Sequence, residues 1–229
     1  MILESIILTS KVTRQQPMDV QWNVAPIGPI VIGGDLQRSA PEFVLRPWEG
    51  STTCDYLKAN PFATLHVTDD VRLIAAAAIS HVDPAPLITP IAGLLQDNFA
   101  ESHHIEFHRL HRCHRWFAVQ IQPLGHDRNR FLADHSKLPG RYEYLAKTIA
   151  SGTVDSFWGF NRAKHAVIEA AILATRLQMT SYSEIRSQLK SLETIVTKTG
   201  GRDEIDAFAE IKAHVQCCSS DLRDQAVTS

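Results

Sequence analysis

The sequence predicts an α+β protein, in which a mainly β N-terminal half is followed by a small α-helical domain. All eleven prolines of the 229-residue chain lie at or before Pro139. Because proline interrupts helices and central strands, long uninterrupted elements are expected only after it. Apolar residues also alternate in short runs before that point and follow helical spacing after it. The expected domains are residues 1–139 and 140–229.

The first domain contains five short apolar runs, bounded by turn residues, that are typical of strands. In the second run Pro26 and Pro29 lack the N–H that a ladder needs, so we expect an edge or bulged strand. Two short helices are expected between strands, one beginning near Ser51 and one over residues 71–80. So many strands with so few helices indicate a small closed barrel. The expected strands are residues 2–9, 22–32, 43–45, 63–68 and 114–122.

The second domain is expected to be helical throughout, after a long loop over residues 123–140. A short helix is expected over residues 141–151. The next helix should begin after Asn161 and run to about Leu177, and it includes a nearly all-apolar stretch over 166–174 that must be buried on several sides.

Two further helices are expected to complete this domain. Ser181 and Glu184 form a capping box that opens the third helix, and a glycine pair ends it. Asp203 is expected to cap the last helix. Its inward-facing residues should be Ile205, Phe208 and Val215.

Composition excludes several classes of protein. The formal net charge is −2 and no basic block stands out, so a nucleic-acid partner is not expected. The longest apolar run, residues 73–79, is far too short to cross a bilayer, and the first residues lack a basic leader. The four cysteines include no Cys-x-x-Cys motif, which favours a reducing, cytoplasmic setting.

The first candidate site is the turn after the third expected strand. Arg46 is followed by Pro-Trp-Glu-Gly and then by three hydroxyl residues, Ser51, Thr52 and Thr53, at the start of a helix. The N–H groups and dipole at such a start attract an anion, and an arginine grips a phosphate well. The alternative is that Ser51 merely caps the helix while Arg46 pairs with a surface acid.

The second candidate is the extended run from Asn23 to Ile30, which includes Val24, Ala25 and Gly28. Small residues and two prolines leave little side-chain bulk, so a flat ring could lie against this backbone. Its amides and carbonyls would then face the polar edge of the ring. The alternative is an edge strand that proline protects from aggregation.

The third candidate is the pair of acids after the fourth expected strand. Asp69 and Asp70 open the second expected helix. An acid in that place is usually a helix cap, and a catalytic role is the alternative.

The histidines gather in residues 103–114, which hold five of the eleven. On a helix, His104, His108 and His111 would share a face with metal-ligand spacing. Alternatively, Ile105 and Phe107 alternate as in a strand, which would place the histidines on a solvated face. We expect the strand and no metal site.

Three segments together resemble an uncharacterised family of the FMN-binding split-barrel superfamily, which includes relatives of flavin reductases and pyridoxamine-phosphate oxidases. They are the Asn-Val-Ala-Pro-Ile-Gly-Pro run from Asn23, the Arg-Pro-Trp-Glu-Gly-Ser-Thr-Thr run from Arg46, and Val-Thr-Asp-Asp-Val from Val67. Residues 160–164 and 166–176 are similar to the C-terminal helical domain of that family. The resemblance covers nearly the whole chain.

The resemblance implies a six-stranded Greek-key split β-barrel, FMN bound without a covalent link, and a homodimer with flavin near the subunit interface. By position, Arg46, Ser51, Thr52 and Thr53 would hold the phosphate. The backbone of residues 23–28 would flank the isoalloxazine. His66, Val67 and Thr68 would line its other side.

The expected function is therefore that of an FMN-binding protein, a flavin reductase-like oxidoreductase that acts on an unknown small molecule. The flavin would carry the electrons, while the protein supplies binding and orientation. One alternative is a flavin carrier or sensor without turnover. Another is a metal-binding protein that uses the histidines of residues 103–114.

Overall fold

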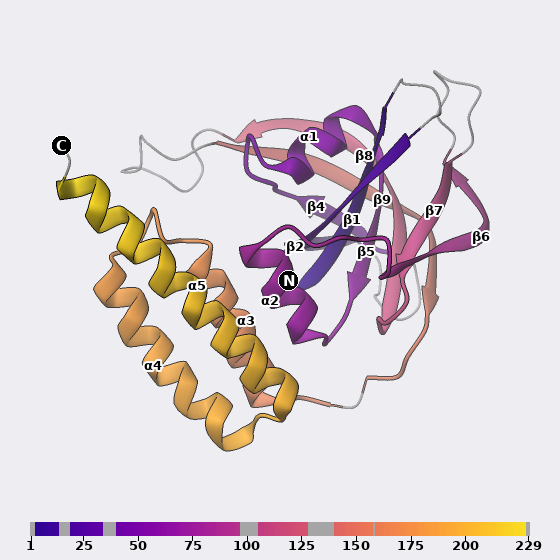
Figure 1. Cartoon of the computed structure of the whole chain (residues 1–229). Helices are drawn as coiled ribbons and strands as arrows, with labels where there is room; N and C mark the ends of the chain where they lie inside the picture. Colours follow the sequence, from indigo (N-terminus) through magenta and orange to yellow (C-terminus); the bar gives the residue numbers. More distant parts are fainter. Residues whose placement is uncertain are drawn as a thin grey trace. The chain divides into compact units, whose positions relative to one another are not determined.

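The chain forms two compact units in the computed structural model (Figure 1), which describes residues 3–13, 19–33, 40–96, 105–127, 140–157 and 159–227. The barrel unit comprises Met1–Thr68 and Asp83–Ser156, and the helical unit comprises Asp69–Val82 and Phe157–Ser229. The first unit consists of strands and one short helix, and the second consists of helices, so the predicted α+β class is confirmed. Among the described residues, no helix combines the length and apolarity needed to cross a membrane.

The barrel unit contains a seven-stranded antiparallel sheet with the strand order β2-β1-β5-β8-β9-β4-β3. The resemblance implies six strands, so the described sheet has one more. The strands are β1 (Ser5–Thr13), β2 (Asp19–Ile27), β3 (Ile30–Gly33), β4 (Glu42–Leu45), β5 (Phe62–Val67), β8 (Arg115–Asp127) and β9 (Arg141–Thr153).

The connection between β2 and β3 makes this sheet curve. These strands stand at opposite ends of the strand order, yet only Gly28 and Pro29 separate them in the chain. Three Cα–Cα steps span at most about 11 Å, so the two edges of the sheet must approach each other there. The predicted single strand over residues 22–32 is thus two strands that begin closure of a barrel, and β2 is the edge strand that its proline indicated.

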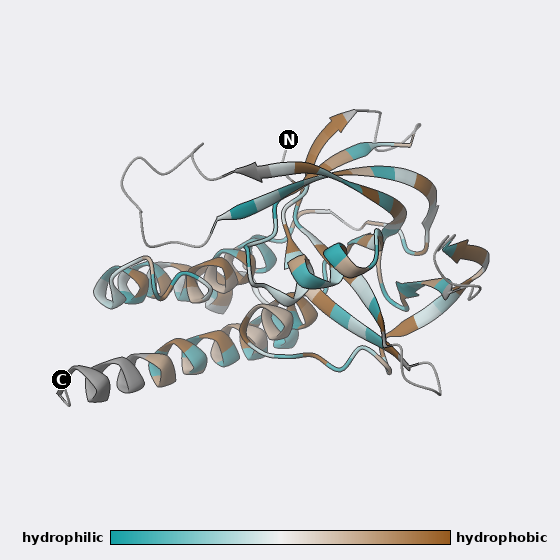
Figure 2. Ribbon diagram, turned by 90° about the horizontal axis from the view of Figure 1, so that it is seen from above, coloured by the Kyte–Doolittle hydropathy of each residue, from teal (hydrophilic) through white to brown (hydrophobic). Residues whose placement is uncertain are grey.

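The two faces of the sheet carry separate cores. Hydrophobic and hydrophilic residues both occur along the strands (Figure 2), and successive side chains of a strand point to opposite faces of the sheet. One face packs Ile7, Leu65 and Phe117 with residues of α1 (Thr52–Ala59). On the other face Phe62 packs against Phe107. Phe107 belongs to a two-stranded sheet formed by β6 (Ile88–Gln96), which the sequence did not predict, and β7 (Ile105–Leu110), where the alternation of Ile105 and Phe107 indicated a strand.

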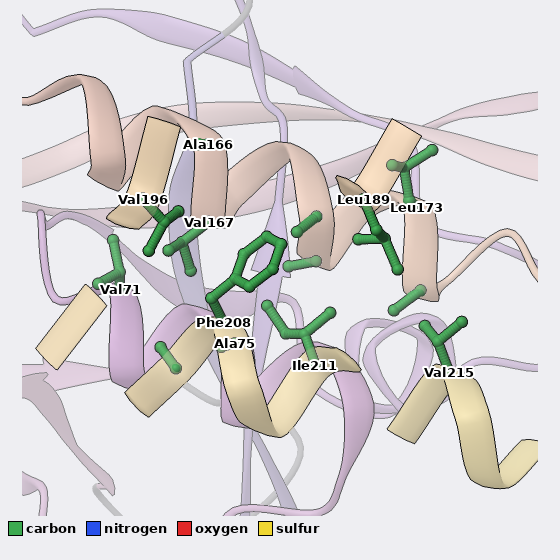
Figure 3. Close-up of a cluster of buried hydrophobic side chains, with 14 of the residues drawn as sticks. Val71, Ala75, Ala166, Val167, Leu173, Leu189, Val196, Phe208, Ile211 and Val215 are labelled. Carbon is green, nitrogen blue, oxygen red and sulfur yellow. The ribbon is translucent and has the colours of Figure 1, made fainter. Parts of the chain in front are cut away.

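The helical unit combines one helix from the N-terminal half with three from the C-terminal part. The helices are α2 (Val71–Ile79), α3 (Arg162–Ala174), α4 (Tyr182–Thr199) and α5 (Arg202–Val227). Their side chains point into a common core that is rich in alanine and valine (Figure 3). Small residues such as Ala166 and Ala170 allow close helix packing, which explains why the apolar stretch of α3 is buried on several sides.

The expected helix over residues 141–151 is wrong, because these residues form β9. Tyr142, Tyr144 and Ala146 pack into the core on one face of the sheet, and the strand pairs with β8 along most of its length. This pairing draws residues up to Ser156 into the barrel unit, while Asp69–Val82 join the helices. The units therefore do not divide at Pro139, where the proline distribution places the boundary.

The helix ends show which caps the sequence predicts well. Asn161 and Ser181 cap α3 and α4, and Asp70 caps α2, as expected. The prediction for α5 is wrong in two details. The helix begins at Arg202, before Asp203, and the Glu204 carboxylate accepts a hydrogen bond from the Gly201 N–H at 2.8 Å. Ile205 is 48% exposed, whereas Phe208 and Val215 are buried.

Candidate functional site

The turn between β4 and α1 is held by the strand that sequence reasoning took for a helix. Trp48 forms a β-bridge with Arg141, and the Glu49 N–H donates to the Gly140 carbonyl at 2.8 Å. Gly50 then turns the chain with φ of 79°, a conformation that favours glycine. A Cβ built on Gly50 would meet no atom within 4 Å, so this side of the turn is open.

Ser51 caps α1, which is the alternative role that the sequence offered for it. Its Oγ accepts a hydrogen bond from the Cys54 N–H at 3.2 Å and donates to the Trp48 carbonyl at 2.7 Å. The helix geometry leaves the N–H groups of Thr52 and Thr53 without an intrahelical acceptor. These amides, with the positive end of the helix dipole, form a place for an anion.

Asn23 joins the two segments that the sequence analysis treated as separate candidates. Its buried amide nitrogen donates to Thr9 Oγ1 at 3.3 Å and to Thr53 Oγ1 at 3.2 Å. Asn23 therefore fixes the first turn of α1 against the β1–β2 pair. Thr53 accepts from Asn23 and keeps its own hydroxyl hydrogen for another acceptor.

Two arginines flank this turn. Arg46 is half-buried and directly follows β4. The Arg141 guanidinium lies 3.9 Å from the centre of the Trp48 ring, a cation–π contact that holds a second positive charge beside the turn. Sequence reasoning missed Arg141 because the strand pairing that carries it there was not recognised. The period-two spacing of Tyr142, Tyr144 and Ala146 was the available signal.

The other end of α1 carries a second cationic and aromatic group. Lys58 Nζ lies 4.1 Å from the centre of the Tyr142 ring. Beneath the helix, Cys54 Sγ lies 3.9 Å from the Tyr144 hydroxyl, and both side chains are buried. Burial and the neighbouring Cys54 raise the pKa of Tyr144, so this phenol stays protonated even above pH 10.

The remaining expected ring contacts lie on both faces of the sheet. Thr9 pairs with Asn23 and Ala63 in the ladders, whereas Ile6 pairs with His66. Since side chains alternate, Asn23, Ala25 and Val67 share one face, and Val24 and His66 lie on the other. Gly28 is exposed between β2 and β3, and Thr68 follows β5.

His66 is a fully buried structural residue. Its Nδ1 lies 3.3 Å from the Ile6 carbonyl, and its Nε2 accepts from the Leu110 N–H at 3.1 Å. Burial lowers the pKa of His66 to about 3, so the ring is neutral. With both nitrogens engaged, the side chain has no polar atom left for a ligand.

Residues 105–110 of the histidine-rich stretch form a strand, as expected. In β7, Phe107 is buried and Glu106 is exposed. The His108 ring lies 4.5 Å from that of Trp22, and its Nδ1 is 3.0 Å from the Glu106 carbonyl. His103 and His104 lie outside the described residues. Within those that are described, no group of three or more His, Cys, Asp or Glu side chains is arranged to hold a metal ion.

The two acids that follow β5, Asp69 and Asp70, form structural interactions. Asp70 Oδ1 accepts from the Leu73 N–H at 3.1 Å, so it caps α2. Asp69 forms an ion pair with Lys164 near the start of α3. Both interactions lie within the helical unit.

Solved structures similar to this one include flavin proteins. An FMN-bound protein from Methanosarcina mazei has a TM-score of 0.66 at 20% identity, over 93% of this chain and 94% of that one. A flavoredoxin from Methanosarcina acetivorans has a TM-score of 0.44 at 12% identity, over 69% and 72%. An FMN-binding protein from Thermus thermophilus has a TM-score of 0.43 at 10% identity, over 67% and 71%.

Family models cover most of the sequence. No curated protein matches the chain. The model described as the N-terminal domain of a protein of unknown function, DUF447, matches residues 4–136, and a second DUF447 model matches residues 161–213. The resemblance noted in the sequence is thereby confirmed, and the chain belongs to the DUF447 family.

Proposed function

We propose that this protein binds FMN without a covalent link and works as a flavin-dependent oxidoreductase. The observation that carries the proposal is the start of α1, where the first amides and hydroxyls of the helix follow an open glycine turn, Arg141 lies on Trp48 beside it, and Arg46 precedes it in the chain. The similar fold of the FMN-bound Methanosarcina mazei protein supports it. Bound FMN would supply the hydride or electron transfer.

The phosphate is assigned to the turn between β4 and α1. The Arg46 guanidinium and the amides of Thr52 and Thr53 would donate to its oxygens, and the hydroxyls of Thr52 and Thr53 would add donors. The Ser51 hydroxyl donates to the Trp48 carbonyl, so Ser51 acts mainly by holding the helix start in place. Arg141, in its cation–π contact with Trp48, would add positive charge near the phosphate.

The ring is assigned to the backbone of β2. Among the described strands, β2 is at one end of the sheet and pairs only with β1, so its outer edge offers amides and carbonyls to a ligand. Asn23 connects this strand to the phosphate turn through Thr53. The His66 side chain is left out of the proposed contacts because its nitrogens are engaged, whereas Val67 and Thr68 remain proposed contacts.

The first experiment is the absorbance spectrum of the purified protein, followed by identification of the released cofactor. A two-band flavin spectrum with FMN is expected. A colourless protein that takes up no added FMN would overturn the proposal.

A second experiment locates the phosphate. Arg46→Ala should weaken FMN at least about tenfold, because a charge-assisted hydrogen bond contributes about 1.5–3 kcal/mol. Riboflavin, which lacks the phosphate, should bind the variant and the parent equally. Lys58→Ala is the matched control, since Lys58 is a cation in the last turn of α1, at the end of the helix away from the proposed phosphate. Equal losses for FMN and riboflavin would show that Arg46 does not hold the phosphate.

Turnover distinguishes an enzyme from a carrier or sensor. Anaerobic addition of NADH or NADPH should bleach the bound flavin if the protein is a reductase. A flavin that no nicotinamide or reduced-deazaflavin donor bleaches would favour the carrier.

We further propose a homodimer, which light scattering tests, and a cytoplasmic location, which suits four cysteines that all remain thiols.

A further inference from the structure

A cysteine and a histidine lie together on α5, outside the proposed flavin site. Cys218 Sγ is 3.6 Å from His214 Nε2, and the two residues are four positions apart on the helix. Residues with this spacing share one face of a helix. Val215, next to His214, points into the helical core (Figure 3), so the rigid packing of α5 holds the pair in place.

The separation of the two donors fits a tetrahedral zinc ion. With Zn–N of about 2.0–2.1 Å and Zn–S of about 2.3 Å, a tetrahedral angle places nitrogen and sulfur about 3.6 Å apart. The structure therefore already has the spacing that two ligands of one zinc ion require. The metal would take the position between Sγ and Nε2 that the proton of this hydrogen bond occupies in the metal-free protein.

We propose that His214 and Cys218 form a two-donor site for Zn²⁺ on the surface of the helical unit. Binding releases the thiol proton to solvent, and the metal takes its place between the thiolate sulfur and the neutral imidazole nitrogen. Water fills the open coordination positions. Because the described residues provide only two donors here, the ion is exchangeable, unlike that of a closed four-ligand site.

Cobalt(II), which replaces zinc and is coloured, tests the site in the full-length protein. A sulfur-to-cobalt charge-transfer band is expected, and added Zn²⁺ should abolish it. The band depends on a thiolate, so the histidines of residues 103–114 do not produce it by themselves. The cysteines of the barrel unit, Cys54 and Cys113, are buried.

Three variants decide the assignment. His214→Ala and Cys218→Ser should each lose the band, while Cys217→Ser, which removes the exposed adjacent thiol, should keep it. All three positions are outside the core, and circular dichroism checks that the variants are folded. No band in the parent protein, or equal loss in Cys217→Ser and Cys218→Ser, would overturn the proposal.

Discussion

The two units differ in what they bury. Both contain well-packed apolar cores, but among the described residues only Glu204 is a buried polar side chain in the helical unit. The described residues of the barrel unit include nine, and most of them form side-chain hydrogen bonds within that unit. They are Ser5, Thr9, Ser10, Asn23, Thr53, Asn60, Thr64, His66 and Gln96.

This difference suggests that hydrogen bonds specify the structure of the barrel unit, whereas apolar packing specifies that of the helical unit. A buried polar group costs several kcal/mol unless it is paired, so each pairing in the barrel unit specifies one arrangement of strands. Asn60 illustrates this, because it donates to Ser10 at 2.8 Å and to Gln96 at 2.9 Å. The helical unit instead depends on shape. Directed polar groups are what a cofactor site requires, which favours the barrel unit as the place of chemistry.

The largest effect is expected from emptying the helical core. Phe208 is 3% exposed and lies among the side chains of Figure 3. Phe208→Ala should lower the free energy of unfolding by about 3–5 kcal/mol, because it removes apolar contacts and leaves a cavity. Chemical denaturation measures the change. Phe160→Ala is the matched control, since Phe160 is 89% exposed and its loss should cost less than about 0.5 kcal/mol.

A somewhat smaller effect is expected from removing one buried polar group of the barrel unit. His66→Ala leaves the Leu110 N–H without its acceptor and opens a cavity, which should cost about 2–4 kcal/mol. A loss below about 1 kcal/mol would show that the polar interior does not specify the strand arrangement.

The same histidine makes stability depend on pH. The pKa of His66 falls from 6.5 to about 3 on folding, so the unfolded chain binds the proton and the folded protein does not. The stabilisation is complete above pH 6.5 and is lost as the pH falls toward 3, with a slope of up to about 1.4 kcal/mol per pH unit. Unfolding measured from pH 7 to 4 should show a shallower decline in His66→Asn than in the parent.

Sequence patterns predicted the elements that local interactions determine. The caps at Ser51, Asn161 and Ser181 depend on residues within one turn, and all were identified. The β9 error had a different cause, since the partners of that strand lie in β8 and β4, far away in the chain. The strand pairing that brings Arg141 to Trp48 is likewise non-local.

The residues of the proposed site differ in the same way. The proposed phosphate turn can be identified from the sequence because Arg46 and Thr53 are close together. The Asn23–Thr53 link spans 30 residues, and only the folded chain shows that the two segments meet. His66 illustrates the opposite limit, because its place in a motif gave no sign that Leu110 and Ile6 occupy both ring nitrogens.

Gly50→Ala tests the open turn, and it should lower the free energy of unfolding by about 1 kcal/mol. Gly50→Ala forces a side chain into a left-handed conformation without a clash, so only backbone strain is added. Gly93→Ala is a matched control in β6, with φ of 74° and equally open surroundings. Both should lose similar stability in chemical denaturation, but only Gly50→Ala should also weaken FMN binding in a titration. Equal FMN affinities in the two variants would argue against a phosphate at this turn.

The smallest effect is expected from the ion pair between Asp69 and Lys164. The two side chains are 41% and 28% exposed, so water screens the attraction, and a double-mutant cycle to alanine should give a coupling of at most about 1 kcal/mol. Glu193 and Lys212, 2.7 Å apart and similarly exposed, form the matched control pair. Added salt should reduce both couplings. A coupling above about 2 kcal/mol for Asp69 and Lys164 alone would mean that a polar contact helps to specify the helical unit too. In that case the helical unit would not be ordered by packing alone, because a polar contact at Asp69, between β5 and α2, would also stabilise it.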